Sequence, residues 1–104
     1  MPEQDVALSD NPAAHRFELR VGDIVAAYAK YNVLSHALLF THTEVLPEFE
    51  GKGHGSRLAR YALDSVRSRG LRAIPACQFI AGYLRKHAEY QDLVAEEHRR
   101  AYKI

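Results

Sequence analysis

A run of alternating glycines between a predicted strand and a predicted helix limits what this chain can fold into more than any other feature. Residues 50–56 have the sequence E-G-K-G-H-G-S, with glycine at 51, 53 and 55. Glycine lacks a Cβ atom, so the backbone N–H groups of this run stay uncovered, and the positive end of the helix dipole lies beside them. The sequence therefore predicts an anion-binding site, with a phosphate-bearing cofactor as the first hypothesis.

Three strands are predicted before the glycine run. Residues 15–20 alternate polar and apolar side chains, and residues 24–31 follow after a turn at Gly22, which predicts an antiparallel hairpin. Residues 36–45 are rich in Leu, Phe, Thr and Val and predict a third, longer strand, which ends before Pro47.

A helix and a fourth strand follow the glycine run. Apolar residues recur at helical spacing from residue 58 to residue 66, and Gly70 suits the C-terminal cap of that helix. Residues 71–77 then predict a strand parallel to the third one, since a helix joins the two. Apolar spacing over residues 79–87 predicts a second helix, and the polar segment 96–100 a short terminal one.

These elements predict a single α/β (α+β) domain, a mixed sheet of three antiparallel strands followed by a β-loop-α-β unit and a second helix. A chain of 104 residues supports one compact domain. The domain is expected to span residues 14–104, after a flexible N-terminal leader at residues 1–13.

Composition excludes several classes of protein. The formal charge of +1 argues against broad binding to nucleic acid or to membranes. The single cysteine, Cys77, excludes an internal disulfide, and no CxxC or spaced Cys/His set predicts a metal site. We find neither a signal peptide nor a stretch near the roughly 18 apolar residues of a spanning helix, so a cytoplasmic protein is the default expectation.

The common nucleotide-binding motifs do not fit the glycine run. A Walker A loop needs G-x-x-x-x-G-K-[ST], which the chain lacks. A dinucleotide-binding motif needs G-x-G-x-x-G after the first strand of a parallel sheet, whereas here G-x-G-x-G follows three antiparallel strands. The alternative of a merely flexible turn is disfavoured by three glycines within five residues at the start of a helix.

Several separated blocks resemble a small acetyltransferase-like group within the GNAT superfamily of acyl-CoA N-acyltransferases. They are T-H-T-E-V-x-P-E-x-x-G-K-G-x-G-S-x-L, L-D-x-V-R-x-R-G-L, I-P-A-C-x-F and Y-L-R-K-H-x-E-Y, in this order within residues 15–94. The resemblance implies acetyl-CoA as cofactor, bound by a [Q/R]-x-x-G-x-[G/A] loop whose amides hold the pyrophosphate. Here that loop has Glu50 in place of Gln or Arg.

The resemblance also implies which residues hold acetyl-CoA. The pyrophosphate would lie on the loop and helix start formed by Gly51, Lys52, Gly53, His54, Gly55 and Ser56. The pantetheine arm would run between the two parallel strands, along the backbone of Thr43, Glu44 and Val45. Lys86 lies in a short basic run that either meets the adenosine 3′-phosphate or is a solvated helix end.

Cys77 has two open roles. It is either a small buried hydrophobic residue, as a lone cytoplasmic cysteine usually is, or a transient acyl acceptor at the end of a parallel strand. A helix N-terminus lowers the pKa of a thiol, and related small proteins also have a cysteine at this position. Direct transfer between bound reactants is the alternative mechanism.

Direct transfer needs a base for the ammonium and an acid for the departing thiolate. Strict alternation places His42 and Glu44 on one face of the third strand, with Thr41 and Thr43 on the other. His42 or Glu44 is the candidate base, although both also suit an exposed sheet surface. Tyr83 is the candidate acid by resemblance, although it also continues an apolar helix stripe.

We therefore expect an acetyl-CoA-dependent N-acetyltransferase acting on an amine of a small molecule, a peptide or a lysine. The short hairpin lacks the early helices that are usual in the family, so the acceptor side should be open, which suits either a protein or peptide acceptor or an enzyme of low selectivity. The alternative is a CoA- or acyl-CoA-binding module or sensor without efficient transfer. The oligomeric state is expected to be a monomer or a weak dimer.

Overall fold

The computed structural model describes residues 5–104 of the chain. Their elements in chain order are β1 (Val6–Asn11), η1 (Pro12–Ala14), β2 (Arg16–Val21), β3 (Ile24–Val33), β4 (Ala37–Val45), η2 (Pro47–Phe49), α1 (His54–Ser68), β5 (Arg72–Pro75), α2 (Gln78–Lys86), η3 (Ala88–Leu93) and α3 (Glu96–Arg99).

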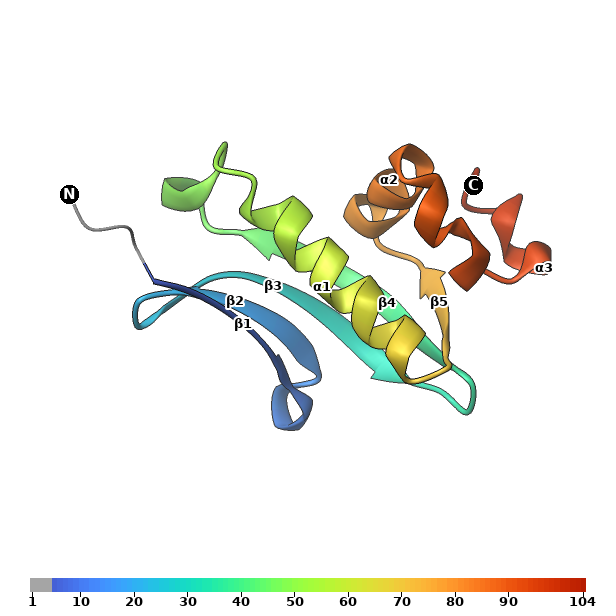
Figure 1. The fold of residues 1–104 in the computed structure, drawn as a ribbon, viewed down its shortest axis with the longest axis horizontal. Coiled ribbons are helices and arrows are strands. Elements are labelled where there is room, and N and C mark those ends of the chain that lie inside the picture. The colour runs from blue at the N-terminus through green and yellow to red at the C-terminus, as the bar shows by residue number, and fades with distance from the viewer. Residues whose placement is uncertain (1–4) are drawn as a thin grey trace.

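The five strands form one mixed sheet in the order β1-β2-β3-β4-β5. The first four strands are antiparallel neighbours, and β5 pairs with β4 in parallel. Helix α1 connects β4 to β5 and lies across one face of the sheet (Figure 1). The predicted mixed sheet with a β-loop-α-β unit and a second helix is therefore confirmed.

The N-terminal segment differs from the expected loose leader. Residues 6–11 form β1, which pairs with β2 over its whole length. The Asp10 carboxylate accepts hydrogen bonds from the Tyr31 hydroxyl at 2.6 Å and from the Arg69 guanidinium at 2.5 Å. These two contacts attach β1 to β3 and to the end of α1, so the expectation of a leader up to residue 13 is wrong for β1. The start of the predicted leader, residues 1–4, lies outside the described residues.

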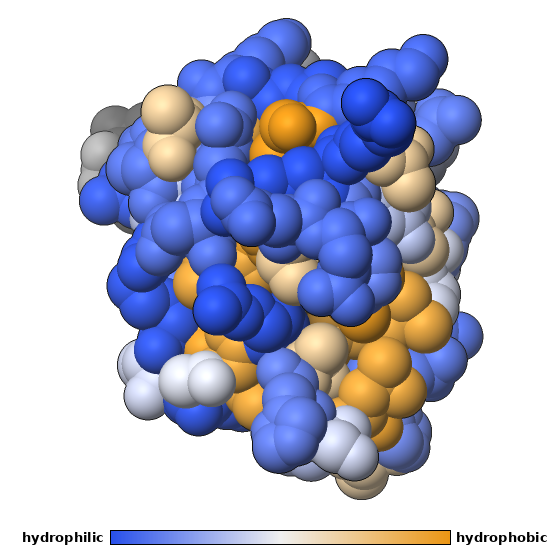
Figure 2. All heavy atoms as spheres, turned by 90° about the vertical axis from the view of Figure 1, so that its right-hand side faces the viewer, coloured by the Kyte–Doolittle hydropathy of each residue, from blue (hydrophilic) through white to orange (hydrophobic). Residues whose placement is uncertain are grey.

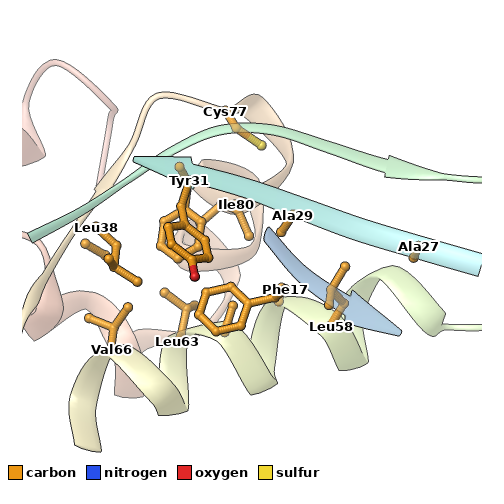
Figure 3. Packing of buried hydrophobic residues seen from close by; sticks show 14 of the residues in the cluster. Phe17, Ala27, Ala29, Tyr31, Leu38, Leu58, Leu63, Val66, Cys77 and Ile80 are labelled. Carbon is orange, nitrogen blue, oxygen red and sulfur yellow. The ribbon is translucent and has the colours of Figure 1, made fainter. Parts of the chain in front are cut away.

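The core lies between the sheet and α1. Phe17 and Tyr31 from the sheet point toward Leu63 and Val66 from α1, and Cys77 lies at the margin of this cluster (Figure 3). The α1 residues at helical spacing, from Leu58 to Val66, are fully buried, as the apolar pattern predicts. Burial of this stripe fixes α1 on the sheet and hence the position of its N-terminus.

The C-terminal helices α2, η3 and α3 gather beside β5 (Figure 1). Arg67 of α1 binds both carboxylate oxygens of Asp92, at 3.0 and 2.8 Å, and Arg85 of α2 donates to the carbonyl oxygen of Tyr102. Seen from this end, the surface is mainly hydrophilic, with hydrophobic side chains in small groups (Figure 2). These contacts attach α1 to η3 and attach α2 to the C-terminal turn.

A β-bulge in β4 decides which side chains share a face. Tyr31 pairs with Phe40, whereas the preceding Lys30 pairs with His42, so Thr41 is an extra residue. Thr43 and Val45 therefore lie on the same face as Phe40, toward α1, while His42 and Glu44 lie on the opposite face. The expectation that Thr41 and Thr43 share a face is wrong, because strict alternation breaks at the bulge.

The sheet face opposite α1 is polar. We call the cross-strand set Arg16, Glu18, Tyr28, Lys30, His42 and Glu44 the polar sheet face. The Glu18 side chain is only 2% exposed and accepts hydrogen bonds from Arg16 at 2.6 Å and from Arg20 and Asn11 at 3.1 Å. Burial alone would raise the pKa of Glu18, but the hydrogen bonds from Arg16 and Asn11 outweigh it and lower that pKa.

The attachment of β1 predicts that Asp10→Ala is destabilising. Loss of two hydrogen bonds to Asp10, one of them from a charged group, should lower the free energy of unfolding by about 1–3 kcal/mol. Urea denaturation measures this. Ser9→Ala is the control, since within the described chain the Ser9 side chain makes no hydrogen bond. Equal stability of both variants and the wild type would mean that the Asp10 contacts with Tyr31 and Arg69 add little to the fold.

The Glu18 network predicts a pH dependence of stability. A carboxyl whose pKa is lower in the folded than in the unfolded chain stabilises the fold above its unfolded pKa, near 4.5, and loses this contribution as pH falls through the folded pKa. Between pH 7 and about pH 3, the free energy of unfolding should therefore fall more steeply for the wild type than for Glu18→Gln. Parallel curves in urea denaturation at each pH would contradict the assignment.

Candidate functional site

The glycine run forms a loop that ends at the N-terminus of α1. Gly51 and Gly53 have φ angles of 79° and 78°, a left-handed conformation that residues with a Cβ atom rarely adopt. Gly53 is the N-cap of α1, and no side chain caps this end of the helix. Because the first intrahelical bond is donated by Arg57, the amides of the residues before it point out of the helix without an intrahelical acceptor.

A cavity of about 480 Å³, the first cavity, lies between this loop and the end of β4. Its lining comes from three parts of the chain, namely Thr43, Glu44 and Val45 from β4, Phe49, Glu50, Gly51, Gly53, His54, Gly55 and Ser56 from the loop and the start of α1, and Phe79 from α2. The candidate cofactor residues of the loop and of β4 therefore meet at one cavity, with the exception of Lys52, which is exposed and is not part of its lining.

The end of β4 is open on the side of β5. The parallel pairing ends where Phe40 meets Pro75, whereas β4 continues to Val45. Proline has no N–H group to donate to a further rung. Within residues 5–104, the backbone from Thr41 to Val45 therefore has β3 on one side and no strand on the other. An extended ligand with amide groups can join such an edge.

Cys77 lies beside this open edge. It directly precedes α2, is 6% exposed, and its Sγ atom lies 3.1 Å from the Oγ1 atom of Thr43. The bulge brings Thr43 to this face, as described above. Cys77 is thus held by a hydrogen bond at the margin of the core, close to the strand that lines the first cavity.

His42 and Glu44 form a pair on the polar sheet face. The Nε2 atom of His42 lies 3.1 Å from the Oε1 atom of Glu44, and the Tyr28 hydroxyl donates to the same oxygen at 3.4 Å. The hydrogen bond with His42 lowers the pKa of Glu44. Both side chains are about half exposed, so this pair is accessible to a ligand from solvent.

A second cavity of about 250 Å³ adjoins the first. Its lining consists of Ser56, Gln78, Phe79, Gly82, Tyr83, Lys86 and His87, so the two cavities share Ser56 and Phe79. Tyr83 and Lys86 therefore lie in the neighbouring cavity and not with Cys77 or the His42–Glu44 pair. Burial raises the pKa of Tyr83, which keeps its hydroxyl protonated at neutral pH.

Phe79 lies in the site although the sequence did not single it out, whereas His87 belongs to the basic run that also contains Lys86. Helical spacing with Tyr83 assigned Phe79 to the core stripe, but the Phe79 side chain is 40% exposed. Its ring lies against Gly55, where a Cβ atom would come within 2.6 Å of Phe79 Cζ. The absence of a side chain at residue 55 was the available signal, since glycine in a helix often permits a close approach.

His54 tests whether the site fits a polar ligand. The side chain is 8% exposed, and neither ring nitrogen has a hydrogen-bond partner within the described residues. Buried polar atoms normally have a partner, so the two ring nitrogens of His54 are unsatisfied polar atoms of a residue that lines the first cavity. The His54 ring and the uncapped amides at the N-terminus of α1 together provide hydrogen-bond donors that fit a phosphate group.

A family model described as GCN5-related N-acetyl-transferase matches residues 16–93. This span covers most of the chain, and the chain belongs to that family. The match begins at the first residue of β2 and ends within η3, so it includes both cavities. No curated protein sequence matched the chain. Within residues 5–104, none of the helices combines the length and the apolar character needed to cross a membrane.

Two glycine-to-alanine substitutions, one in the left-handed loop and one within α2, are predicted to change the free energy of unfolding in opposite directions. Gly53→Ala should lower the free energy of unfolding by about 1–2 kcal/mol, because its φ of 78° strains a residue with a Cβ atom. No atom lies within 4 Å of that Cβ position, so a clash does not contribute. Gly82→Ala, within α2, is the matched control and should raise stability by up to about 1 kcal/mol. Urea denaturation giving the same sign for both would contradict the loop conformation.

Proposed function

We propose that this protein is an acetyl-CoA-dependent N-acetyltransferase that transfers an acetyl group directly to an amine. One observation supports it above all others: the uncapped N-terminus of α1 and the open edge of β4 line the same cavity. A phosphate group fits the first and an extended arm with amide groups fits the second, and acetyl-CoA has both. Membership of the N-acetyltransferase family agrees with this combination.

The binding roles follow from the lining of the first cavity. The backbone of Gly51, Gly53 and Gly55, with the amide and hydroxyl of Ser56, holds the pyrophosphate, and His54 supplies a further polar contact. Lys52, which is exposed on the same loop, adds positive charge near the phosphates. Thr43, Glu44 and Val45 bind the pantetheine arm through their backbone.

His42 is the proposed base. Glu44 remains ionised at neutral pH, because its pKa is lowered, and so orients the imidazole and stabilises its protonated form. His42 takes the proton of the acceptor ammonium. The neutral amine nitrogen would then form a bond to the acyl carbon of a bound thioester while the carbon–sulfur bond breaks, and the nitrogen would release its second proton to solvent through the exposed polar sheet face.

Tyr83 is the proposed acid. Its raised pKa keeps the hydroxyl protonated, so Tyr83 would supply a proton to a departing thiolate and would regain one from solvent. In this mechanism Cys77 has a positioning role, because its thiol is buried against Thr43 and helps to hold the end of β4.

The polar sheet face is the proposed acceptor side. The strands β2 and β3 are joined by a turn at Gly22 and Asp23 with no helix between them, so this face stays open next to His42. An open face accommodates an amine on a peptide, on a protein lysine or on a small molecule. The donor and the acceptor would thus approach β4 from opposite sides.

A second candidate is a CoA- or acyl-CoA-binding module without efficient transfer. The observation that favours it is the exposure of His42, which is 55% exposed on an open face instead of enclosed in a pocket. Enclosure strengthens the electrostatic interactions on which catalysis depends. The module would use the same first cavity and the same ligand.

Calorimetric titration with acetyl-CoA and mass spectrometry of amine acceptors distinguish the two candidates. We expect binding in the micromolar to low-millimolar range and acetyl transfer to at least one class of amine, among small amines, peptide N-termini and lysine peptides. Binding without transfer to any of them would support the module. Absence of binding at low-millimolar acetyl-CoA would contradict both.

The mechanism predicts different effects of His42→Gln and Cys77→Ser. Removal of the base should lower kcat about a hundredfold, whereas Cys77→Ser should keep kcat near the wild-type value. His36→Gln, at an exposed histidine outside the site, is the control. Acetyl-Cys77 trapped during turnover, together with lost transfer in Cys77→Ser, would replace direct transfer by transfer through the thiol.

A further inference from the structure

Strand β1 forms one edge of the sheet. Within residues 5–104 it has β2 as its only neighbouring strand, at the opposite end of the strand order from β5 (Figure 1). The amide of Gly22 donates to the carbonyl oxygen of Asp5 at 2.9 Å, so these two residues form a hydrogen-bonded pair that continues the β1–β2 ladder. Since such pairs alternate along antiparallel strands, the backbone N–H and C=O groups of Val6, Leu8 and Asp10 point away from β2.

The outer edge of β1 has little of the protection that sheet edges usually carry. Proteins commonly protect an edge with a lysine, a proline or a bulge. Residues 6–10 have the sequence V-A-L-S-D, and the register between β1 and β2 is unbroken. Among residues 5–104, no loop or turn backbone forms a hydrogen bond with the outward groups of this strand. The edge is therefore open to a further antiparallel strand.

The outward groups of β1 are complementary to those of a second copy of β1. With a twofold axis at Leu8, this residue pairs with Leu8 of the second copy, and Val6 pairs with Asp10 of the second copy. Each of these pairs brings outward N–H and C=O groups together and exchanges both hydrogen bonds. A twofold axis at Asp10 would instead place two carboxylates opposite each other, which is unfavourable. The axis at Leu8 pairs every outward group of the strand without opposing like charges.

A third cavity of about 210 Å³ lies beside β1 on the α1 side of the sheet. Its lining consists of Leu8, Arg57, Arg60, Tyr61 and Asp64. Leu8 lies beside this stretch of α1, whereas Asp10 binds Arg69 further along the helix, so β1 and α1 run in the same direction. The cations therefore lie toward the start of both elements and the carboxylate toward their ends.

This order of charges suits a second copy of the chain. The twofold axis places both α1 helices on the same side of the joined sheets and reverses one relative to the other. The Arg57 end of the cavity in one copy then faces the Asp64 end of the cavity in the other. Neither Arg57 nor Arg60 forms an ion pair within the described chain, and the formal charge of +1 opposes association only weakly.

We propose that β1 is a dimerisation edge, at which two copies of the chain join their sheets through antiparallel β1 strands related by a twofold axis at Leu8. The interface consists of one short strand from each copy and the third cavity beside it, and interfaces of this size are weak. The polar sheet faces of both copies would lie on the same side of the joined sheet. The pairing does not depend on the proposed function.

Sedimentation equilibrium of the full chain tests the proposal. Between about 10 µM and 1 mM we expect a monomer–dimer equilibrium with a dissociation constant of roughly 50–500 µM, as for other weak interfaces. A chain that remains monomeric over this whole range would overturn the proposal and leave the edge to a strand from another protein.

Two substitutions of Leu8 test whether the outward amide takes part. Leu8→Ala and Leu8→Pro both remove the side chain, but only proline removes the N–H group, which points away from β2. Because that amide donates in both copies, Leu8→Pro should dimerise at least about tenfold more weakly than Leu8→Ala. Circular dichroism checks that both variants fold. Equal dissociation constants for the two folded variants would overturn the pairing.

Cysteine substitutions test the register independently. Residues of a hydrogen-bonded pair have Cα atoms about 5.5 Å apart, which a disulfide can bridge, so Leu8→Cys should form a covalent dimer under mild oxidation. Val6→Cys is the matched control on the same strand face, because its two copies would lie about 14 Å apart. The wild type, whose single cysteine is the buried Cys77, gives the background. No covalent dimer of Leu8→Cys, or equal cross-linking of both variants, would overturn the twofold axis at Leu8.

Discussion

The early end of the pairing between β4 and β5 is the constraint on which the site depends. Pro75 pairs with Phe40 in the last rung, and its missing N–H group prevents the ladder from continuing. From there the chain turns at Cys77 into α2, whereas β4 continues to Val45. Both the open edge and the first cavity follow from this divergence. If β5 stayed paired with β4 as far as Val45, the backbone of β5 would fill the space of the first cavity.

The bulge at Thr41 is the second constraint, because it separates two kinds of chemistry along one strand. Without it, His42 would share the α1-facing side with Phe40. With it, Thr43 turns toward Cys77 and the core, while His42 turns to the polar sheet face and pairs with Glu44. The last five residues of β4 thus present a backbone edge beside the first cavity and the proposed base, His42, on the opposite face of the sheet.

Short-range patterns in the sequence predicted the elements whose formation depends on residues close together in the chain. The apolar period of α1, the glycines at its start and Gly70 at its end placed that helix, and the helix in turn required β5 to be parallel. Strand β1 was missed because its residues Ser9, Asp10 and Asn11, followed by Pro12, favour turns. What orders them is a long-range contact of Asp10 with Tyr31 and Arg69, which no local pattern contains. The bulge in β4 likewise depends on its pairing with β3. The exposure of Phe79 depends on how α2 packs against α1.

The glycines of the loop have two distinct physical roles. Gly51 and Gly53 are required by their left-handed backbone, and open space surrounds both. Gly55 is helical, and its role is to permit the Phe79 ring to approach the first turn of α1. This close approach brings the N-terminal ends of α1 and α2 together, and Ser56 and Phe79 therefore line both cavities. Glu50 lines the first cavity, and the uncapped amides of α1 supply positive potential that offsets its charge. In the proposed site, the donors to a phosphate group are therefore backbone amides, which a side chain at residue 50 does not replace.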